Sequence, residues 1–376
     1  MTRFGRIRSV LAALGGVLLP AGDVLAQFPT TVMLEELDGA NGFVVRGVEY
    51  NQFADTLAAI GDVNADGVVD LASGKSGLQW YPDCYCVETP GMAHVIFGHR
   101  GVGGGGLWTV DDLDATTGIH VPEIGFRTCH GNVSGAGDFN DDGIDDFLVS
   151  ACCSSGGGWW YSGETYVIYG GRGVAGAGVF DVGALDGTNG FAMYGATAQM
   201  TLGARMAPAG DLNGDGVDDI MFGNVVATVD GKIHVGQVYV LWGGRGLGAS
   251  GAFYMKDWTP EVGLIINGMH ESGVAGYSLA PLGDFDGDGV DDFAVAVVWQ
   301  QHTVTGADYG SLHVVFGRRM GDADLDLADI GPMQVCFHRL VEGDVPDECH
   351  PFDFDRDNDV DQADHAAFAA ALTGPQ

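Results

Sequence analysis

The chain has 376 residues, 63 of them Gly, and its 51 Asp and Glu against 16 Lys and Arg give a formal net charge of −35. A hydrophobic content of 46% is enough for a packed core and excludes general disorder. Nucleic acid and anionic membrane surfaces are disfavoured as partners, because phosphate binding needs a basic surface. Acidity on this scale favours divalent cations as partners.

Residues 1–26 have the pattern of a secretory signal peptide. Three Arg residues in the first eight positions are followed by an apolar stretch at 10–21 and a small-residue cleavage signature at 24–26. The stretch is too short for a membrane span, and a buried helix is the alternative. We therefore expect cleavage before Gln27 and export as a secreted, cell-surface or periplasmic protein, because no later segment reaches membrane-spanning length.

Three short sequence motifs recur along the chain at a similar spacing from one another, two of them four times and one three times. An acidic segment occurs as GDVNADGVVD (61–70), GDFNDDGIDD (137–146), GDLNGDGVDD (210–219) and GDFDGDGVDD (283–292), with first aspartates 76, 73 and 73 residues apart. An aromatic–Gly pair follows each one, at 97–98, 169–170, 242–243 and 316–317, and LDGANGF (37–43), LDATTG (113–118) and LDGTNGF (185–191) precede the first three. The shared register indicates repeat units at about 37–101, 108–173, 180–246 and 253–319.

Each unit is predicted to consist of short strands. The runs AHVIFG, TYVIYG, VYVLWG and LHVVFG are apolar on consecutive residues, which is typical of strands buried on both faces. A further strand, such as 179–182, is expected after each Gly-rich turn, and no segment in 27–343 has helical periodicity. Small sheets with two apolar faces bury them by packing around an axis, so the pattern predicts an all-β propeller.

The phrases GDLNGDGVDD, VYVLWGGRG and LDGTNGF resemble FG-GAP repeats, the blades of the integrin α-subunit propeller and its bacterial relatives. The resemblance covers about 31–335 within a domain placed at 27–335, and it implies a β-propeller with calcium loops between the first two strands of each blade. Integrin-type propellers have seven blades and this sequence shows four units, so blade number and ring closure stay open. One hypothesis is that the similar segments 31–36 and 325–330 meet in one sheet.

The four acidic loops are also predicted to bind calcium from their own residues. Asp or Asn at alternate positions can converge, a Gly permits the sharp turn, and hard oxygen ligands favour Ca²⁺ over Mg²⁺. The alternative is a turn in which Asp and Asn only form local backbone hydrogen bonds, and repetition in register favours calcium. The expected ligands are Asp62, Asn64, Asp66, Val68 and Asp70; Asp138, Asn140, Asp142, Ile144 and Asp146; Asp211, Asn213, Asp215, Val217 and Asp219; Asp284, Asp286, Asp288, Val290 and Asp292, with the Val and Ile residues contributing their carbonyls.

A fifth acidic segment, at 353–364, has the spacing of an EF-hand loop. Asn358 replaces the usual Gly, and the Ala-rich stretch 365–372 is predicted to be the exit helix. The tail 353–376, after a connector at 336–352, is similar to a single dockerin or EF-hand half-motif, and the second dockerin loop is absent; whether it anchors, sorts or docks stays open. About five Ca²⁺ ions are expected in all, the fifth held by Asp353, Asp355, Asp357, Asp359, Asp361 and Asp364.

The connections between the second and third strands should lie at the end of the sheets opposite the acidic loops. Their aromatic residues could stack on sugars or hold a protein partner, or could pack on each other beneath a disulfide. The odd count of seven Cys residues leaves at least one thiol unpaired or shared between chains. A bridge from Cys84 or Cys86 to Cys152 or Cys153 is one candidate. The aromatic candidates for a ligand face are Trp80, Tyr81, Tyr85, Trp159, Trp160 and Tyr161.

No catalytic motif is evident, since the sequence has no G-x-S-x-G elbow, no H-E-x-x-H and no P-loop. We therefore predict an exported, non-enzymatic, calcium-binding propeller that acts as an extracellular adhesion or ligand-recognition module for a protein or glycan. One alternative is an accessory or catalytic component of extracellular polysaccharide processing, suggested by the tail and the tryptophans. Another is a structural surface-layer protein.

Overall fold

The structure of the protein is a computed structural model. It describes residues 33–47, 53–75, 78–80, 86–88, 91–99, 101–124, 131–171, 173–174, 176, 178–244, 246–301 and 308–318. The signal peptide, the connector and the tail therefore lie outside the described residues, and so does segment 325–330. The described part is all-β, with twenty short strands and four 3-10 helices of three residues each.

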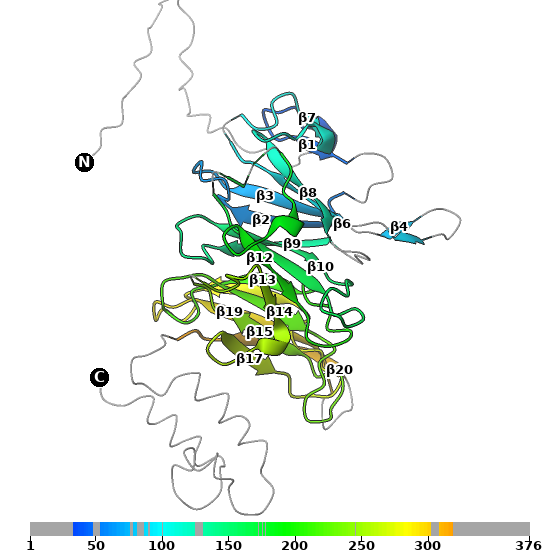
Figure 1. The fold of residues 1–376 in the computed structure, drawn as a ribbon, viewed down its shortest axis with the longest axis vertical. Coiled ribbons are helices and arrows are strands. Elements are labelled where there is room, and N and C mark those ends of the chain that lie inside the picture. The colour runs from blue at the N-terminus through cyan, green and yellow to red at the C-terminus, as the bar shows by residue number, and fades with distance from the viewer. Residues whose placement is uncertain are drawn as a thin grey trace, which may run out of the picture.

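The strands form four antiparallel sheets, which we call blades 1 to 4 in chain order (Figure 1). Blade 1 contains β2 (Thr56–Gly61), β3 (Asp70–Lys75), β6 (Gly91–Ile96) and β8 (Gly118–Ile124). Blade 2 contains β9 (Gly131–Gly137), β10 (Asp146–Ala151), β11 (Glu164–Ile168) and β12 (Gly190–Tyr194). Blade 3 contains β13 (Met206–Gly210), β14 (Asp219–Asn224), β15 (Gln237–Leu241) and β17 (Gly263–Asn267), and blade 4 contains β18 (Leu279–Gly283), β19 (Asp292–Gln301) and β20 (Asp308–Val315).

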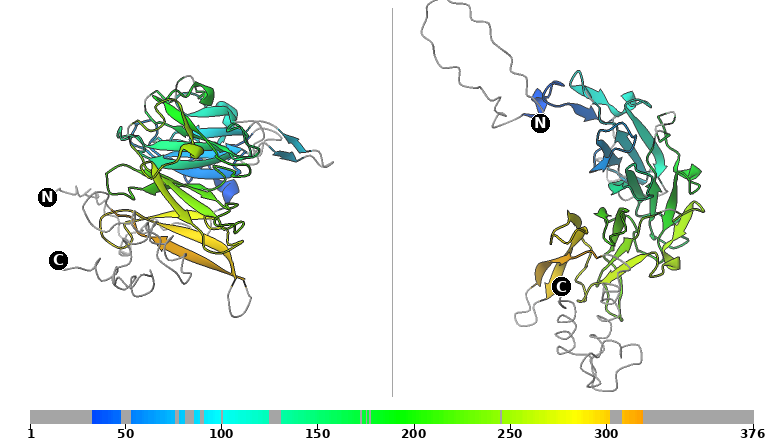
Figure 2. Two further views of the ribbon diagram at one scale, coloured as in Figure 1. Left: turned by 60° about the horizontal axis from the view of Figure 1, so that its bottom comes forward. Right: turned by 90° about the vertical axis from the view of Figure 1, so that its left-hand side faces the viewer.

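The blades follow one another in a curved, four-blade propeller arrangement, with blades 1 and 4 at its two ends (Figure 2). The first strand of each blade contacts the first strand of the next, so β2, β9, β13 and β18 line the inner side in succession. Three apolar cores fill the spaces between successive blades. The all-β propeller predicted from the repeats is confirmed.

The connection from the third to the fourth strand of a blade reaches back to the preceding blade. Strand β16 (Ala252–Tyr254) pairs in parallel with β12 of blade 2, and β7 (Leu107–Thr109) pairs in the same way with β1 (Val44–Arg46). In blades 1 to 3, the fourth strand comes from the beginning of the following sequence unit. The remaining elements are η1 (Leu34–Glu36), η2 (Val110–Asp112), η3 (Val182–Ala184), η4 (Met255–Asp257) and the hairpin of β4 (Leu78–Trp80) with β5 (Cys86–Glu88).

Two strand predictions need correction. The strand expected at 179–182 is wrong, because only Val179 forms a bridge, with His120, and the Asp181 side chain accepts the Gly183 N–H to start η3. The fourth apolar run was expected to be buried on both faces, but Leu312 and Val314 of β20 are exposed. The described residues place no following blade against that side of the sheet.

A β-bulge precedes each acidic loop, at Gly61, Gly137, Gly210 and Gly283. These four residues have φ between +64° and +78°, a conformation that favours Gly because it has no Cβ. The bulge turns the chain out of the sheet at the same point in every blade. In the described part, no helix is long and apolar enough to cross a membrane.

Candidate metal centre

The acidic loops join the first and second strands of the four blades, as the family resemblance implied. We number each loop from its first aspartate, so that position 1 is Asp62 in blade 1 and position 9 is Asp70. In blades 1 to 3, the N–H of the first loop aspartate donates to a carboxylate in the loop of the next blade. The four loops therefore lie together at one end of the blades.

The first aspartate folds its loop by accepting backbone N–H groups. In blade 2, Asp138 accepts from Asp142 at 2.9 Å and from Gly143 at 2.8 Å, and Asp62 and Asp211 do the same in blades 1 and 3. The Gly at position 6 has φ between +88° and +91° in all four loops, which permits this tight turn. These are the local bonds of the acidic-turn alternative, yet each carboxylate has about four acceptor sites and so can also bind a cation.

The closing aspartate at position 9 is buried in every loop. In blade 3, Asp219 accepts the Leu212 N–H at 3.0 Å and the N–H of Gly243, the Gly of the aromatic–Gly pair, at 2.9 Å. Burial raises the pKa of Asp219 and Asp146 to about 8 and that of Asp70 to about 6, with neighbouring loop carboxylates adding to the increase. A buried carboxylate with a raised pKa is one that a cation would stabilise in its charged form.

The residues at position 3 also suit a metal. Among the described residues, Asn64 Oδ1 and Asn140 Oδ1 are buried and accept no hydrogen bond. A buried carbonyl oxygen without a partner is unfavourable, and a hard cation would satisfy it. In blade 3, the corresponding Asn213 Oδ1 instead accepts the Asp215 N–H at 2.9 Å.

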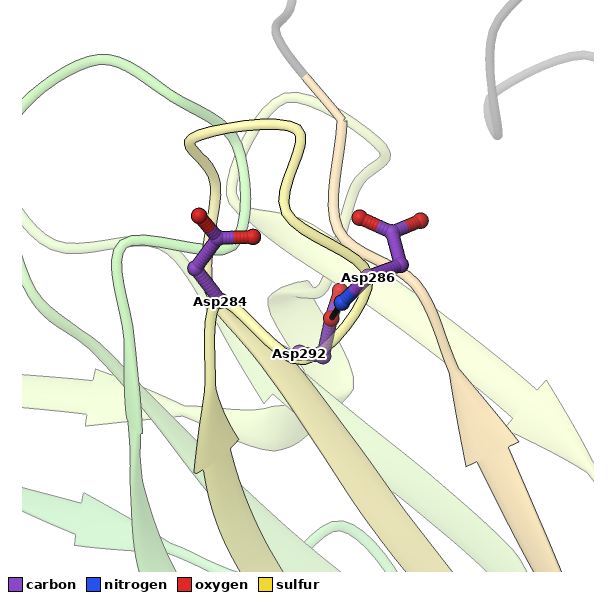
Figure 3. Close-up of side chains that lie close together, drawn as sticks. All are labelled: Asp284, Asp286 and Asp292. Atoms are coloured by element: carbon purple, nitrogen blue, oxygen red, sulfur yellow. Dashed lines mark hydrogen bonds between the residues drawn. The ribbon is translucent and has the colours of Figure 1, made fainter.

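Blade 4 brings the carboxylates closest together. Asp284, Asp286 and Asp292 each place a carboxylate oxygen within 4.8 Å of the others, from both sides of the loop (Figure 3). Within the described part of the chain, this is the only such group of three acidic, His or Cys residues. The donor set, three carboxylates on a short loop, fits Ca²⁺. The other three loops have the same scaffold with Asn in place of Asp at position 3, at Asn64, Asn140 and Asn213.

The residue at position 8 has a role that sequence reasoning missed. The carboxylates of Asp145, Asp218 and Asp291 each accept the N–H of the first loop aspartate in the preceding blade, at 2.7, 2.8 and 3.1 Å. Each also fills the space that a Cβ would need at the bulge Gly of that blade. The signal was present as an Asp-Asp doublet in units 2 to 4, where unit 1 has Val69-Asp70.

The other predicted site residues divide into described and undescribed ones. Trp159 and Trp160 are exposed in the connection between β10 and β11, and the Trp160 and Tyr161 rings meet edge to face at 4.4 Å. The side chains of Trp80, Tyr81 and Tyr85 and the ligands predicted at 353–364 lie outside what the structure describes. Cys152 and Cys153 are buried, and Cys153 is disulfide-bonded. The side chains of Cys84 and Cys86 lie outside what the structure describes, so a bridge from either of them to Cys152 or Cys153 stays a prediction.

Comparison with known proteins supports the repeat assignment. No family model matches the chain. A segment of 89 residues, 23% of the chain, is 43% identical to integrin alpha-PS2 of Drosophila melanogaster, and 120 residues, 31% of the chain, are 36% identical to integrin alpha-5 of Xenopus laevis. A segment of 123 residues, 32% of the chain, is 39% identical to phosphatidylinositol-glycan-specific phospholipase D of Bos taurus.

The matched segments cover 6%, 10% and 14% of these three relatives, so the chain spans a small part of each of them. Together with the four sheets and their loops, the similarity supports an FG-GAP-type, integrin α-like β-propeller for the described blades.

Proposed function

We propose that this chain is an exported β-propeller that takes up calcium in its acidic loops and acts as a non-catalytic, extracellular adhesion or ligand-recognition module. The observation that carries the proposal is the acidic loop itself, present in four blades and brought to one end of them, with three carboxylates converging in blade 4. The similarity of the blades to integrin α-subunits supports recognition of an extracellular protein or glycan.

Calcium would be held by the carboxylates at loop positions 1, 5 and 9, the side-chain oxygen at position 3 and the backbone carbonyl at position 7. When bound, the ion supplies positive charge that offsets repulsion among the loop carboxylates. Asp292 and its equivalents already fix the loop by accepting the N–H of the Gly in the aromatic–Gly pair; in blade 4, the Gly317 N–H donates to Asp292 Oδ1 at 2.9 Å. A fifth ion would bind at 353–364.

The test combines metal binding with ligand binding. The chain from Gln27 onward is dialysed against calcium and its bound metal counted, and it is then applied to arrays of extracellular matrix proteins and of glycans with calcium or with a chelator. We expect several bound ions and retention on an array only with calcium. Absence of bound calcium, or retention that is unchanged by the chelator, would contradict the proposal.

Export is part of the proposal and has its own test. Expression of the full chain with its first 26 residues should release a product whose N-terminus is Gln27, measured by mass spectrometry of the secreted protein. An intracellular product that retains Met1 would contradict export.

We propose no catalytic role for the described residues, although one relative is named as a phospholipase D. The loop carboxylates are engaged with backbone N–H groups, as Asp62 is with Asp66 and Gly67, and would be engaged with calcium. The direct test is an assay of the chain on glycosylphosphatidylinositol-anchored protein, in which we expect no released anchor.

A second candidate function is glycan binding through the loop between β10 and β11. Trp159 and Trp160 are 54% and 59% exposed, and flat aromatic rings at such exposure can stack on sugars. Replacing both by Ala should abolish binding on a glycan array, whereas Trp299→Ala, at an equally exposed tryptophan of β19, should not. Equal loss from all three replacements would argue against a specific sugar site.

A further inference from the structure

Each boundary between two successive blades is built from the same two halves. The earlier blade contributes the N–H of loop position 1 and the carbonyl and apolar side chain of position 2, which together we call the offering half. The later blade contributes the carboxylate at position 8 and the N–H that follows its aromatic–Gly pair, which together we call the inserting half. At the first boundary, Asp62 N–H donates to Asp145 and Gly171 N–H donates to Val63 O at 2.8 Å. The Phe139–Gly244 and Leu212–Arg318 pairs repeat the second bond, both at 2.8 Å.

Among the described residues, none fills the offering half of blade 4. Phe285, at position 2, is 63% exposed, whereas Val63, Phe139 and Leu212 are buried at the three internal boundaries. Leu312 is 70% exposed on the same sheet, where Val238 of blade 3 is buried. Gly283 keeps φ = +64°, and the space of its missing Cβ is open, with no neighbour closer than Asp291 Oδ1 at 3.9 Å.

Within the described ranges, no residue lies opposite the inserting half of blade 1. Leu57 of β2 and Val69 at position 8 are each 61% exposed, and Leu71 of β3 is exposed beside them. The residue that corresponds to Leu71 in blade 2, Phe147, is buried against blade 1. Val69 occupies position 8, where blades 2 to 4 have Asp, so the inserting half of blade 1 is more apolar than those of the other blades.

We propose that the blade 4 face binds the blade 1 face of a second copy of this chain, head to tail. The two exposed faces are the two halves of an interface that the chain forms three times within itself, so each is complementary to the other and not to itself. Exposed apolar faces of this kind mark association sites. Head-to-tail contacts between two copies close into a ring when the curvature permits and otherwise extend into a chain of copies.

Residue 69 makes the proposal directional. In the assembly, Val69 of one copy lies at Gly283 of the other, where the internal boundaries place a carboxylate against the first loop N–H. The Asp284 N–H then lacks the acceptor that Asp62, Asp138 and Asp211 have. Val69→Asp supplies that acceptor, so it should tighten association by about tenfold, although it adds negative charge to an acidic protein.

The experiment measures the mass of the chain from Gln27 onward by light scattering and sedimentation in calcium over a wide concentration series. Leu312→Glu removes the blade 4 face and Leu57→Glu removes the blade 1 face, so each variant alone should give only single chains. Mixing the two variants should restore pairing, because one boundary then joins two intact faces. Ile233→Glu, at an exposed residue on neither face, is the matched control and should associate like the parent. Circular dichroism and the unfolding midpoint establish that each variant is folded.

Four results would overturn the proposal. The parent could have the mass of one chain at every concentration, as it would if its own two ends met in one sheet. Leu57→Glu could associate normally while Leu312→Glu does not, which would mean that blade 4 pairs with blade 4. The mixture could fail to recover, or Val69→Asp could weaken association, and either result would exclude the head-to-tail boundary.

Discussion

The backbone N–H of Asp62 donates a 2.7 Å hydrogen bond to Oδ2 of Asp145, a residue 83 positions later and in the next blade. Asp138 with Asp218 and Asp211 with Asp291 form the same bond at the next two boundaries. The residue at position 1 is a proposed calcium ligand and the residue at position 8 is not. Each loop is therefore held in shape partly by the following blade, which couples the loops to blade packing.

Loss of one of these bonds should destabilise the array. Asp218→Ala leaves the Asp138 N–H without its 2.8 Å partner, and we expect a cost of about 1–3 kcal/mol in the free energy of unfolding. Asp218→Asn retains an acceptor oxygen and should cost less. Urea unfolding of the calcium-loaded protein measures both, and equal losses from Ala and Asn would show that the bond itself is unimportant.

The bulge Gly of blade 2 should not tolerate a side chain. Gly137 has φ = +64°, and an added Cβ would collide with the Asp218 carboxylate, so Gly137→Ala should destabilise the protein through both strain and displacement of that carboxylate. Gly231→Ala is the control, because Gly231 has φ = +77° with nothing within 4 Å and so tests strain alone, about 1 kcal/mol. If thermal unfolding gave the same loss for both, the contact with Asp218 would have no cost.

The side chain at loop position 2 should contribute to the free energy of unfolding between two blades, but not in blade 4, where it is exposed. Phe139 is fully buried in the core between blades 2 and 3, so Phe139→Ala should cost about 3–5 kcal/mol of stability. Phe285→Ala changes the equivalent residue of blade 4, which is exposed, and should leave the unfolding free energy of a single chain nearly unchanged while weakening self-association. Urea unfolding at low protein concentration and sedimentation separate the two effects; a large stability loss in the Phe285 variant would show that this side chain is covered within one chain.

Removal of calcium should lower the thermal midpoint, because calcium binding stabilises the folded loops. One site contributes about 2.7 kcal/mol to the free energy of unfolding when free calcium is at one hundred times its dissociation constant. Asp286→Asn removes one of the three converging carboxylates of blade 4 and should weaken calcium binding, as measured by calorimetry. Asp111→Asn, in η2 outside the loops, is the charge-matched control. A midpoint that did not change in excess chelator would refute calcium binding in these loops.

Acid should destabilise blade 1 through His94. Burial lowers the pKa of His94 from 6.5 to about 4, with contributions from His120, whose Nδ1 lies 2.9 Å from that of His94, and from Lys75. Because the unfolded chain binds the proton more readily, this contribution is present above pH 6.5 and is lost as the pH falls toward 4, up to about 3 kcal/mol.

His94→Gln cannot titrate, so the difference in unfolding free energy between this variant and the parent should shrink or reverse as the pH falls through that range. Comparing the two proteins at each pH cancels the contribution of the loop carboxylates. A parent–variant difference that stays constant from pH 7 to pH 4 would exclude His94 as the group responsible.

Much of the fold could be predicted, because its signals are local. The Asp and Gly spacing of GDLNGDGVDD determines a turn within ten residues, and the loops are where the repeats indicated. The candidate ligands share that turn, but their convergence at Asp284, Asp286 and Asp292 depends on side-chain positions that spacing does not determine. The parallel pairing of β16 with β12 was equally hidden, because it joins residues of different units.

The order of the amino acids was sufficient to specify the repeat, its period near 73 residues and the acidic turn in every unit, since hydrophobic pattern, Gly conformations and Asp hydrogen bonds act over a few residues. Only the tertiary structure decided that Asp145 serves the loop of Asp62, that Phe139 is buried and that Phe285 is not. These outcomes depend on which blade lies against which. A repeated sequence supplies equivalent surfaces to every unit, and burial differs because, among the described residues, the blades at the two ends have a neighbour on one side only.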